Sequence, residues 1–271
     1  MGAGYEPGAA GPAVPGAEAT GETGAETVGD VVHARVRADI LFGQLAPGQR
    51  LRLDEASRRY GVGVGTMREL LNRLASEGLV VAEAQRGFEV APASPSEFRE
   101  IVDLRLLLEG HALALSFAAG DLDWEARVVA AHHKLAVTES RMLAGAETDP
   151  TPVRQCDRDF HRALISACGS RVLMETHGSV HDRYLRYLTI AVIFRGEVSV
   201  REHAALRDCA LARDVRRASA ILKVHIESCL EHALAAEPPD WASKVPRNAG
   251  TRARPATAAA RARSGRVPRG R

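Results

Sequence analysis

Four side chains in the second half of the chain have the types and spacing of a divalent metal site: Asp157, His161, His203 and His225. Asp157 and His161 are four residues apart, so a helix places both on one face. His203 and His225 flank a predicted turn at Arg213-Asp214 at similar distances, so an antiparallel hairpin brings them level. One carboxylate and three imidazoles suit Zn²⁺, Ni²⁺ or Mn²⁺, and they leave positions open for water or a ligand carboxylate.

The remaining histidines are expected to be ordinary surface or core residues: His33, His111, His132, His133, His177, His181 and His232. Asp159 is next to the predicted ligands but on another helix face, so we expect it to be exposed. A metallohydrolase that activates water on the same ion is an alternative. The chain has no HExxH motif, however, and no evident general base beside the predicted ligands.

Arginines in the first third of the chain have the placement of a DNA-contact surface. Thr66 is predicted to cap a helix, with Glu69 in a capping-box position. Arg68 then lies in the first turn, where the helix dipole and free N–H groups already favour phosphate. The predicted DNA-contact residues are Arg50, Arg58, Gly65, Thr66, Arg68, Arg73, Arg86 and Gly87. The alternative is that these arginines only solvate the surface.

Glycine and proline breaks define the elements that would hold these arginines. Apolar periodicity predicts three helices, over about residues 28–41, 54–60 and 66–77. It also predicts a two-stranded hairpin with a basic tip, whose strands are residues 79–81 and 88–90. This is the layout of a winged helix-turn-helix domain, which we place at residues 28–93.

The metal ligands fall in a second region, residues 96–236, which reads as helices throughout. Ser94 and Pro95 are predicted to begin it. Later breaks divide it into six or seven helices, at Gly120, Gly145–Pro152, Gly169-Ser170, Gly196 and Arg213-Asp214. With aromatic residues at only 4% of the chain, Leu, Val, Ile and Ala must build the core, which suits packed helices. The predicted fold is mainly α: a winged helix-turn-helix followed by an all-α bundle that serves as effector domain.

The two ends differ from the rest of the chain. Residues 1–27 are acidic and rich in Gly, Ala and Pro, and residues 241–271 form a basic tail; both are expected to be disordered. Four cysteines without a CxxC pair indicate reduced thiols: Cys156, Cys168, Cys209 and Cys229. No membrane span or export signal is recognisable, so we expect a cytoplasmic, nucleoid-associated protein.

Three ordered motifs resemble the GntR family of bacterial regulators: Leu45–Leu51 (a PGxRL turn), Tyr60–Val80 (an xxVREALxxLxxEGLV helix) and Gln85–Ala91 (an RGxxV wing). Most members carry Ser-Arg-Thr where this chain has Gly63-Val64-Gly65, so Val64 replaces a common base-reading arginine. A subgroup that resembles the regulators of glutarate and carbon-starvation genes shares the Gly-Val-Gly version. The operator sequence stays open.

The second half resembles the FCD effector domain of the FadR-type branch of this family. Asp103–Glu109 matches its ExRxxLE stretch, and its DxxFH, EH and HI motifs match Asp157–His161, Glu202-His203 and Lys223–Ile226. The resemblance implies that Arg105 points into the effector cavity and holds a carboxylate bidentately. The alternative is that Arg105 only pairs with Glu109.

The resemblance implies a regulator, usually a repressor in this branch, that binds a double-stranded DNA operator as a homodimer. A small carboxylate metabolite would bind the metal and Arg105 and reorient the DNA-binding heads. Besides the metallohydrolase, a regulator that senses the metal directly is an alternative. The effector, the regulated genes, and activation as opposed to repression are left open by the sequence.

Overall fold

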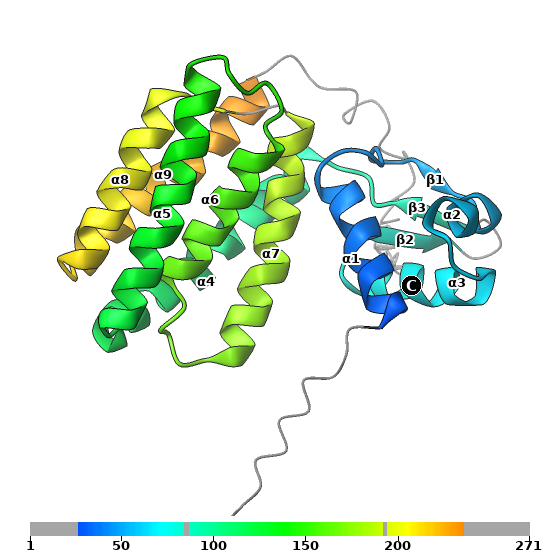
Figure 1. The fold of residues 1–271 in the computed structure, drawn as a ribbon, viewed down its shortest axis with the longest axis horizontal. Helices are drawn as coiled ribbons and strands as arrows, with labels where there is room; N and C mark the ends of the chain where they lie inside the picture. Colours follow the sequence, from blue (N-terminus) through cyan, green and yellow to red (C-terminus); the bar gives the residue numbers. More distant parts are fainter. Residues whose placement is uncertain (1–26, 84–86, 192–193, 236–271) are drawn as a thin grey trace, which may run out of the picture.

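The computed structural model describes residues 27–83, 87–191 and 194–235, which form an N-terminal head and a helical bundle side by side (Figure 1). Some sequence predictions fall outside the described residues: the disordered extension apart from Thr27, the basic tail, and the wing-tip Arg86. None of the described helices combines the length and apolar character needed to cross a membrane.

The head contains α1 (Val28–Leu41), α2 (Leu53–Tyr60) and α3 (Val64–Ser76), with strands β1 (Arg50–Leu51), β2 (Val80–Glu83) and β3 (Gly87–Val90). Its core is mainly aliphatic, with Met67 and Leu74 fully buried on the inner face of α3. The predicted hairpin is present, but the sheet has a third strand and the order β1-β3-β2, antiparallel throughout. The winged helix-turn-helix prediction is confirmed.

The turn between α2 and α3 depends on glycine. Gly61 ends α2 with φ 72°, a left-handed conformation in which a side chain would be strained. Gly63 is the N-cap of α3, in an extended conformation and without a side-chain hydrogen bond. The prediction that Thr66 caps this helix is therefore wrong. Gly65 and Thr66 instead lie in its first turn, which contains no acidic residue.

The bundle has six helices among the described residues: α4 (Pro95–Ala119), α5 (Leu122–Leu143), α6 (Thr151–Leu164), α7 (Arg171–Ile190), α8 (Glu197–Leu211) and α9 (Val215–Ala235). The predicted breaks separate these helices, although α6 ends at Leu164, before the break at Gly169-Ser170, and α7 ends at Ile190, before the break at Gly196. Ser94 caps α4 as predicted, since its hydroxyl accepts a hydrogen bond from the Glu97 N–H at 3.1 Å. The interior combines apolar side chains such as Trp124 and Phe160 with fully buried charged groups such as Arg105 and Glu109.

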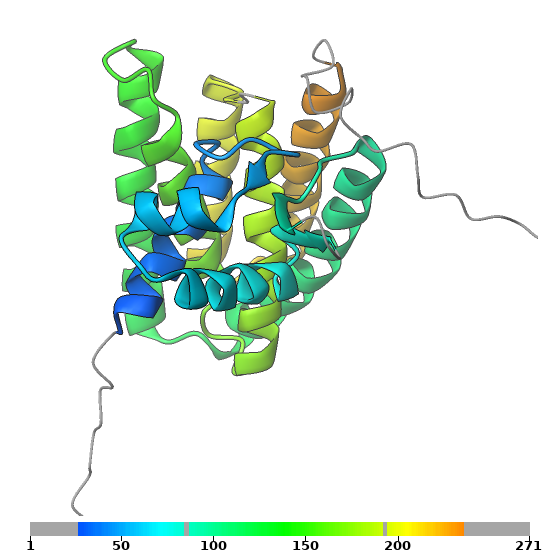
Figure 2. The ribbon, with the colours of Figure 1, turned by 90° about the vertical axis from the view of Figure 1, so that its right-hand side faces the viewer.

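The head and the bundle meet where α1 packs against α7. Asp182 of α7, only 1% exposed, pairs with Arg37 of α1 and with Arg158 of α6. Arg37 also pairs with Glu77, just beyond α3, at 2.9 Å. Viewed from the head side, α3 runs across the front of the molecule, away from this junction (Figure 2). One buried carboxylate thus joins the N-terminal head to two bundle helices.

Candidate metal centre

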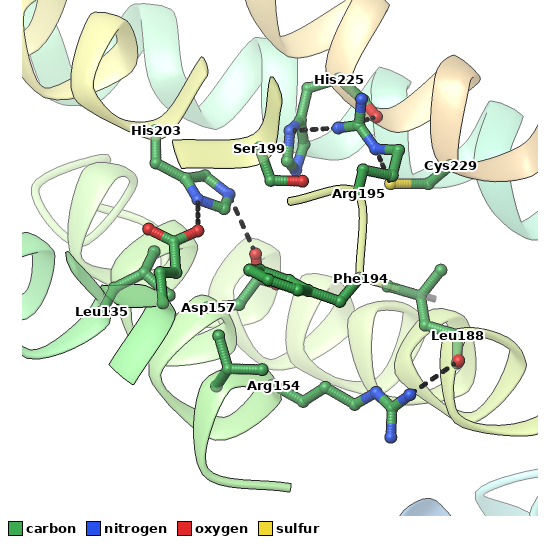
Figure 3. A pocket seen from close by; sticks show the side chains of 12 residues that line it. Leu135, Arg154, Asp157, Leu188, Phe194, Arg195, Ser199, His203, His225 and Cys229 are labelled. Atoms are coloured by element: carbon green, nitrogen blue, oxygen red, sulfur yellow. Dashed lines mark hydrogen bonds and ion pairs between the residues drawn. The ribbon is translucent and has the colours of Figure 1, made fainter. Parts of the chain in front are cut away.

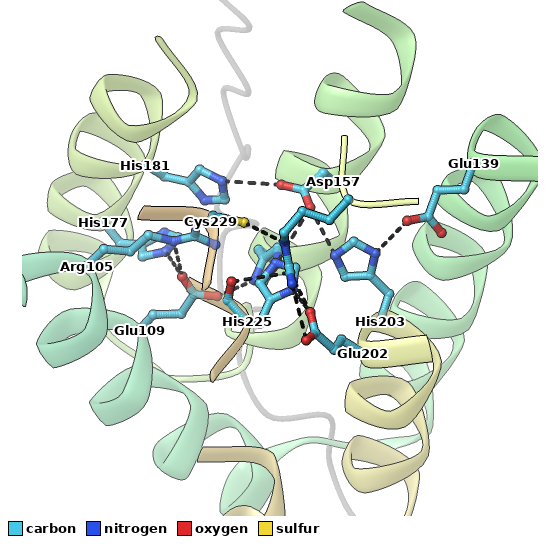
Figure 4. Close-up of polar contacts among 12 residues, drawn as sticks. Arg105, Glu109, Glu139, Asp157, His177, His181, Glu202, His203, His225 and Cys229 are labelled. Carbon is cyan, nitrogen blue, oxygen red and sulfur yellow. Dashed lines mark hydrogen bonds and ion pairs between the residues drawn. The ribbon is translucent and has the colours of Figure 1, made fainter. Parts of the chain in front are cut away.

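The four predicted metal ligands lie together inside the bundle, and Figure 4 shows three of them, Asp157, His203 and His225. Asp157, His161, His203 and His225 each offer a ligand atom within 4.8 Å of the other three. Nε2 of His161 and Nε2 of His203 lie 3.7 Å and 3.1 Å from Asp157 Oδ1. The expected spacing along α6 and the expected α8–α9 hairpin therefore hold.

The α8–α9 turn explains why two histidines distant in sequence come level. Arg213 takes a positive φ of 57°, and the Asp214 carboxylate accepts a hydrogen bond from the Arg217 N–H at 3.0 Å. The chain therefore turns back between α8 and α9, and the two helices form a hairpin. The rings of His203 and His225 end 4.7 Å apart, measured between centroids.

Each ligand histidine has its Nδ1 against a glutamate. His161 contacts Glu109; Nδ1 of His203 lies 2.8 Å from Glu139, and Nδ1 of His225 lies 2.8 Å from Glu202. A carboxylate that accepts the Nδ1 proton fixes the tautomer, so Nε2 carries the lone pair. The Nε2 atoms of His161 and His203 are buried and make no hydrogen bond. Free imidazole lone pairs that converge with a carboxylate fit a divalent ion.

Charge in this cluster is strongly coupled. Burial disfavours the charged forms, but contacts with Asp157 and Glu139 outweigh it and raise the pKa of His203 to about 9. At Glu202, burial is likewise outweighed, by hydrogen bonds from His225 and Arg195, and the pKa falls to about 2. For His225, burial dominates and lowers the pKa to about 3. Without an ion, both ring nitrogens of His203 are therefore protonated at neutral pH, and a divalent ion must displace the Nε2 proton to bind there.

The sequence left two roles open for Arg105: an ion pair with Glu109 and the binding of an effector carboxylate. The structure shows the first and leaves the second open. It is fully buried, its Nε donates to Glu109 Oε2 at 2.8 Å, and its guanidinium lies 4.2 Å from the centroid of the Tyr184 ring. Arg105 and Glu109 therefore form a buried ion pair. Nη1 and Nη2, however, have no hydrogen-bond partner, so two donors remain for a carboxylate.

A small cavity of about 40 Å³ adjoins the predicted ligands Asp157, His203 and His225. It lies between Arg154, Phe194, Arg195 and Ser199 (Figure 3). Arg195 is paired with Glu202 at 2.5 Å. Arg154 donates to the Leu188 carbonyl at 3.0 Å, and burial lowers its pKa to about 10. Arg105 does not line this cavity.

Sequence reasoning missed several residues of the site. Glu139 and Glu202 were not singled out, and His177 and His181 were expected to be ordinary. The latter two are buried beside Glu109, whose Oε2 lies 2.9 Å from His177 Nε2. Glu202 could have been found from its place in the EH motif. No sequence pattern pointed to Glu139, because it lies on α5, which contributes none of the four predicted ligands. Asp159 is exposed, as expected.

The predicted DNA-contact residues that the structure describes are all exposed on the head: Arg50, Arg58, Gly65, Thr66, Arg68, Arg73 and Gly87. Gly65 and Thr66 are in the first turn of α3, whereas Arg68, which was predicted to lie there, is the fifth residue of the helix and follows that turn. Arg73, in the last turn, pairs with Asp30 of α1 at 3.0 Å. It thus braces α3 against α1, which the sequence did not indicate.

Comparisons with known proteins agree with this architecture. Residues 29–90 match the model for bacterial regulatory proteins of the gntR family, and residues 100–228 match the FCD domain. The chain is 41% identical over 202 residues to BphR of Paraburkholderia xenovorans, described as an uncharacterized HTH-type transcriptional regulator, covering 72% of this chain and 81% of that protein. It is 32% identical over 197 residues to the HTH-type transcriptional repressor GlaR of Escherichia coli, covering 70% and 89%.

Among solved structures, E. coli McbR/YncC superposes with a TM-score of 0.67 at 18% identity, covering 77% of this chain and 97% of that one, which supports the fold. A GntR transcriptional regulator from Rhodococcus sp. RHA1 gives a TM-score of 0.65 at 25% identity, covering 77% and 98%. Because these relatives and both matched domains are those of transcriptional regulators, the chain is not an enzyme, as the sequence predicted. The metallohydrolase alternative is therefore wrong. The chain belongs to the GntR family of bacterial regulatory proteins, with an FCD domain as its helical half.

Proposed function

We propose that this chain is a transcriptional repressor whose operator binding is controlled by a small carboxylate held at a metal ion in the FCD domain. Asp157, His161, His203 and His225 would hold the ion. The observation that carries the proposal is the arrangement of the three imidazoles. Each turns Nδ1 to a glutamate, and the free Nε2 atoms of His161 and His203 face Asp157. The donor set suits Zn²⁺, Ni²⁺ or Mn²⁺.

The effector is proposed to be an acid because of Arg105. A guanidinium that is fully buried and uses only Nε for an ion pair has two further donors that an anion can satisfy. A bound ion supplies Lewis acidity that attracts the same carboxylate. Repression is proposed because the relative GlaR is described as a repressor.

The junction between α1 and α7 offers a route by which the effector reaches the head. Asp157, a proposed ligand, is next in sequence to Arg158, which pairs with Asp182. Asp182 also holds Arg37 of the head. A shift of α6 on effector binding would alter this buried ion-pair group, and with it the orientation of α1. The heads are proposed to act in pairs on a two-fold operator.

The test is operator binding by chelator-treated and metal-loaded protein, each with and without an acid. A thermal-shift screen of short dicarboxylates and sugar acids first selects an acid that raises the Tm of the loaded protein. We expect this acid to weaken operator binding only when metal is present. Release of DNA by metal alone would establish a direct metal sensor instead, and an equal acid response in the stripped protein would contradict the proposal.

Replacement of Arg68 by alanine should weaken operator binding by about 1–3 kcal/mol. The side chain is exposed near the N-terminus of α3, just after its first turn, where it can reach a base edge or a phosphate. A gel-shift titration measures the effect. Arg171→Ala, which removes an exposed arginine on the bundle, is the matched control and should bind as the wild type does. An unchanged affinity in Arg68→Ala would remove this residue from the interface.

Replacement of Asp182 by asparagine should uncouple the effector from DNA binding. The change keeps the size of the side chain but removes the charge that holds Arg37 and Arg158. We expect metal content and acid binding to persist while the acid-dependent change in operator affinity shrinks. Calorimetry with the selected acid and gel shifts measure the two parts. A full allosteric response in Asp182→Asn would show that the signal takes another route.

A further inference from the structure

A second group of metal-ligating side chains lies next to the proposed ion: Glu109, His177 and His181 (Figure 4). One ligand atom from each lies within 4.8 Å of the other two, and all three residues are at most 2% exposed. His177 and His181 are four residues apart on α7, hence on one helix face. This repeats the arrangement that α6 gives to Asp157 and His161.

His181 is the unexplained member of this group. It is 1% exposed, and neither of its ring nitrogens makes a hydrogen bond. Buried polar atoms are nearly always satisfied by a protein partner, water or an ion. An imidazole with two unsatisfied nitrogens inside a helical bundle therefore indicates a missing partner. With Glu109 and His177 beside it, that partner has the chemistry of a cation.

Asp157 faces both groups with different oxygens. Its Oδ1 lies 3.1 Å from His203 Nε2, while its Oδ2 lies 3.8 Å from His181 Nε2. A carboxylate in this position can bind one ion through each oxygen. The two groups are thus halves of one centre that share Asp157.

We propose that Glu109, His177, His181 and Oδ2 of Asp157 form a second divalent-cation site, so that Asp157 bridges two ions. Because Asp157 is shared, this inference rests on the proposed function. Two imidazoles favour a borderline metal such as Zn²⁺ or Ni²⁺ over Mg²⁺ or Ca²⁺. Arg105 lies against Glu109 and repels a cation. The second ion therefore binds more weakly than the first.

The second site has its own access. A cavity of about 490 Å³ between head and bundle is lined by His177 and His181, and also by Arg37 and Glu77 of the head. An ion can reach the site from the domain junction without crossing the bundle. His181 is adjacent in sequence to Asp182, which pairs with Arg37. An ion bound at the second site can therefore act on the head through the pair of Asp182 with Arg37.

The test is zinc stoichiometry of the full chain, stripped with chelator and dialysed against buffers of rising free Zn²⁺, with elemental analysis. Wild type should take up a first equivalent and then a weaker second one. His181→Gln and His177→Gln should each lose the second equivalent and keep the first. The control His111→Gln, at an exposed position, should keep both. Circular dichroism verifies that each variant is folded.

The outcomes separate the two proposals. Wild type that binds none of Zn²⁺, Ni²⁺ and Mn²⁺ defeats the proposed function itself. Wild type that saturates at one equivalent, with His181→Gln unchanged, overturns the second site and leaves the proposed function standing. A second equivalent that survives both substitutions also overturns it. If a variant does not fold, Mn²⁺-loaded wild type decides: two ions bridged by Asp157 give an exchange-coupled EPR spectrum, and an uncoupled spectrum refutes the site.

Discussion

His203→Ala should lose its tightly bound metal and unfold at a lower temperature than the wild type. The imidazole is one of three that converge with Asp157, and it joins α8 to α6 and α9. An ion that binds only the folded state adds stability that grows with its concentration above Kd, about 4 kcal/mol at a thousandfold excess. For a domain of this size, that corresponds to a decrease in Tm on the order of 10 °C. Elemental analysis and thermal melts measure the two effects.

Controls distinguish loss of the ion from simple damage to the fold. His133→Ala changes an exposed position on α5 and should leave both metal content and Tm unchanged. Chelator treatment should lower the Tm of the wild type by more than that of His203→Ala, because the variant has already lost the more tightly bound ion. A full equivalent of metal bound as tightly as in the wild type in His203→Ala or His225→Ala would mean that these four residues are not one site, and the carboxylate effector would lose its main support.

Local rules predicted the helix ends where the chain itself carries the signal. Gly169 and Gly196 have φ of 72° and 61°, a conformation that glycine adopts without strain. The rule failed at Thr66, because the residue in the extended cap conformation is Gly63, which has no capping side chain. It also missed β1, because two residues form a strand only by pairing with Phe88 and Glu89 of β3. That pairing is tertiary and leaves no local pattern.

The positions of the proposed metal ligands were predictable for a similar reason, and their surroundings were not. Asp157 and His161 share a helix face, and His203 and His225 lie on a hairpin whose turn can be read in the chain. Glu139 meets His203 only because α5 packs against α8. His181 meets Asp157 only because α7 packs against α6. Such contacts depend on how helices are arranged in space, which periodicity does not encode.

Glu109→Met should destabilise the bundle by about 3–5 kcal/mol, since breaking a buried ion pair leaves the other charge unpaired. Glu109 is fully buried and is the only acidic ion-pair partner of Arg105 among the described residues. It also accepts contacts from His161 and His177, which would lose their acceptor. Urea unfolding followed by circular dichroism measures the loss.

The exposed pair Arg171–Glu175 is a matched control for Arg105–Glu109. Both are i,i+4 pairs, with N–O distances of 2.7 Å and 2.8 Å. Surface pairs contribute about 0–1 kcal/mol, so Glu175→Met should change stability little. Equal losses in Glu109→Met and Glu175→Met would show that burial does not set the cost.

The double variant Arg105→Met/Glu109→Met separates the charge of Arg105 from its role in effector binding. Removing both charges takes away the unpaired guanidinium, so the double variant should be more stable than Glu109→Met alone. If Arg105 binds the acid, this restored protein should keep its operator affinity yet fail to respond to the acid in a gel shift. A double variant no more stable than the single one would mean that the lost contacts of His161 and His177, rather than the stranded charge, account for the destabilisation. An acid response that survives in a stable double variant would remove Arg105 from the effector site.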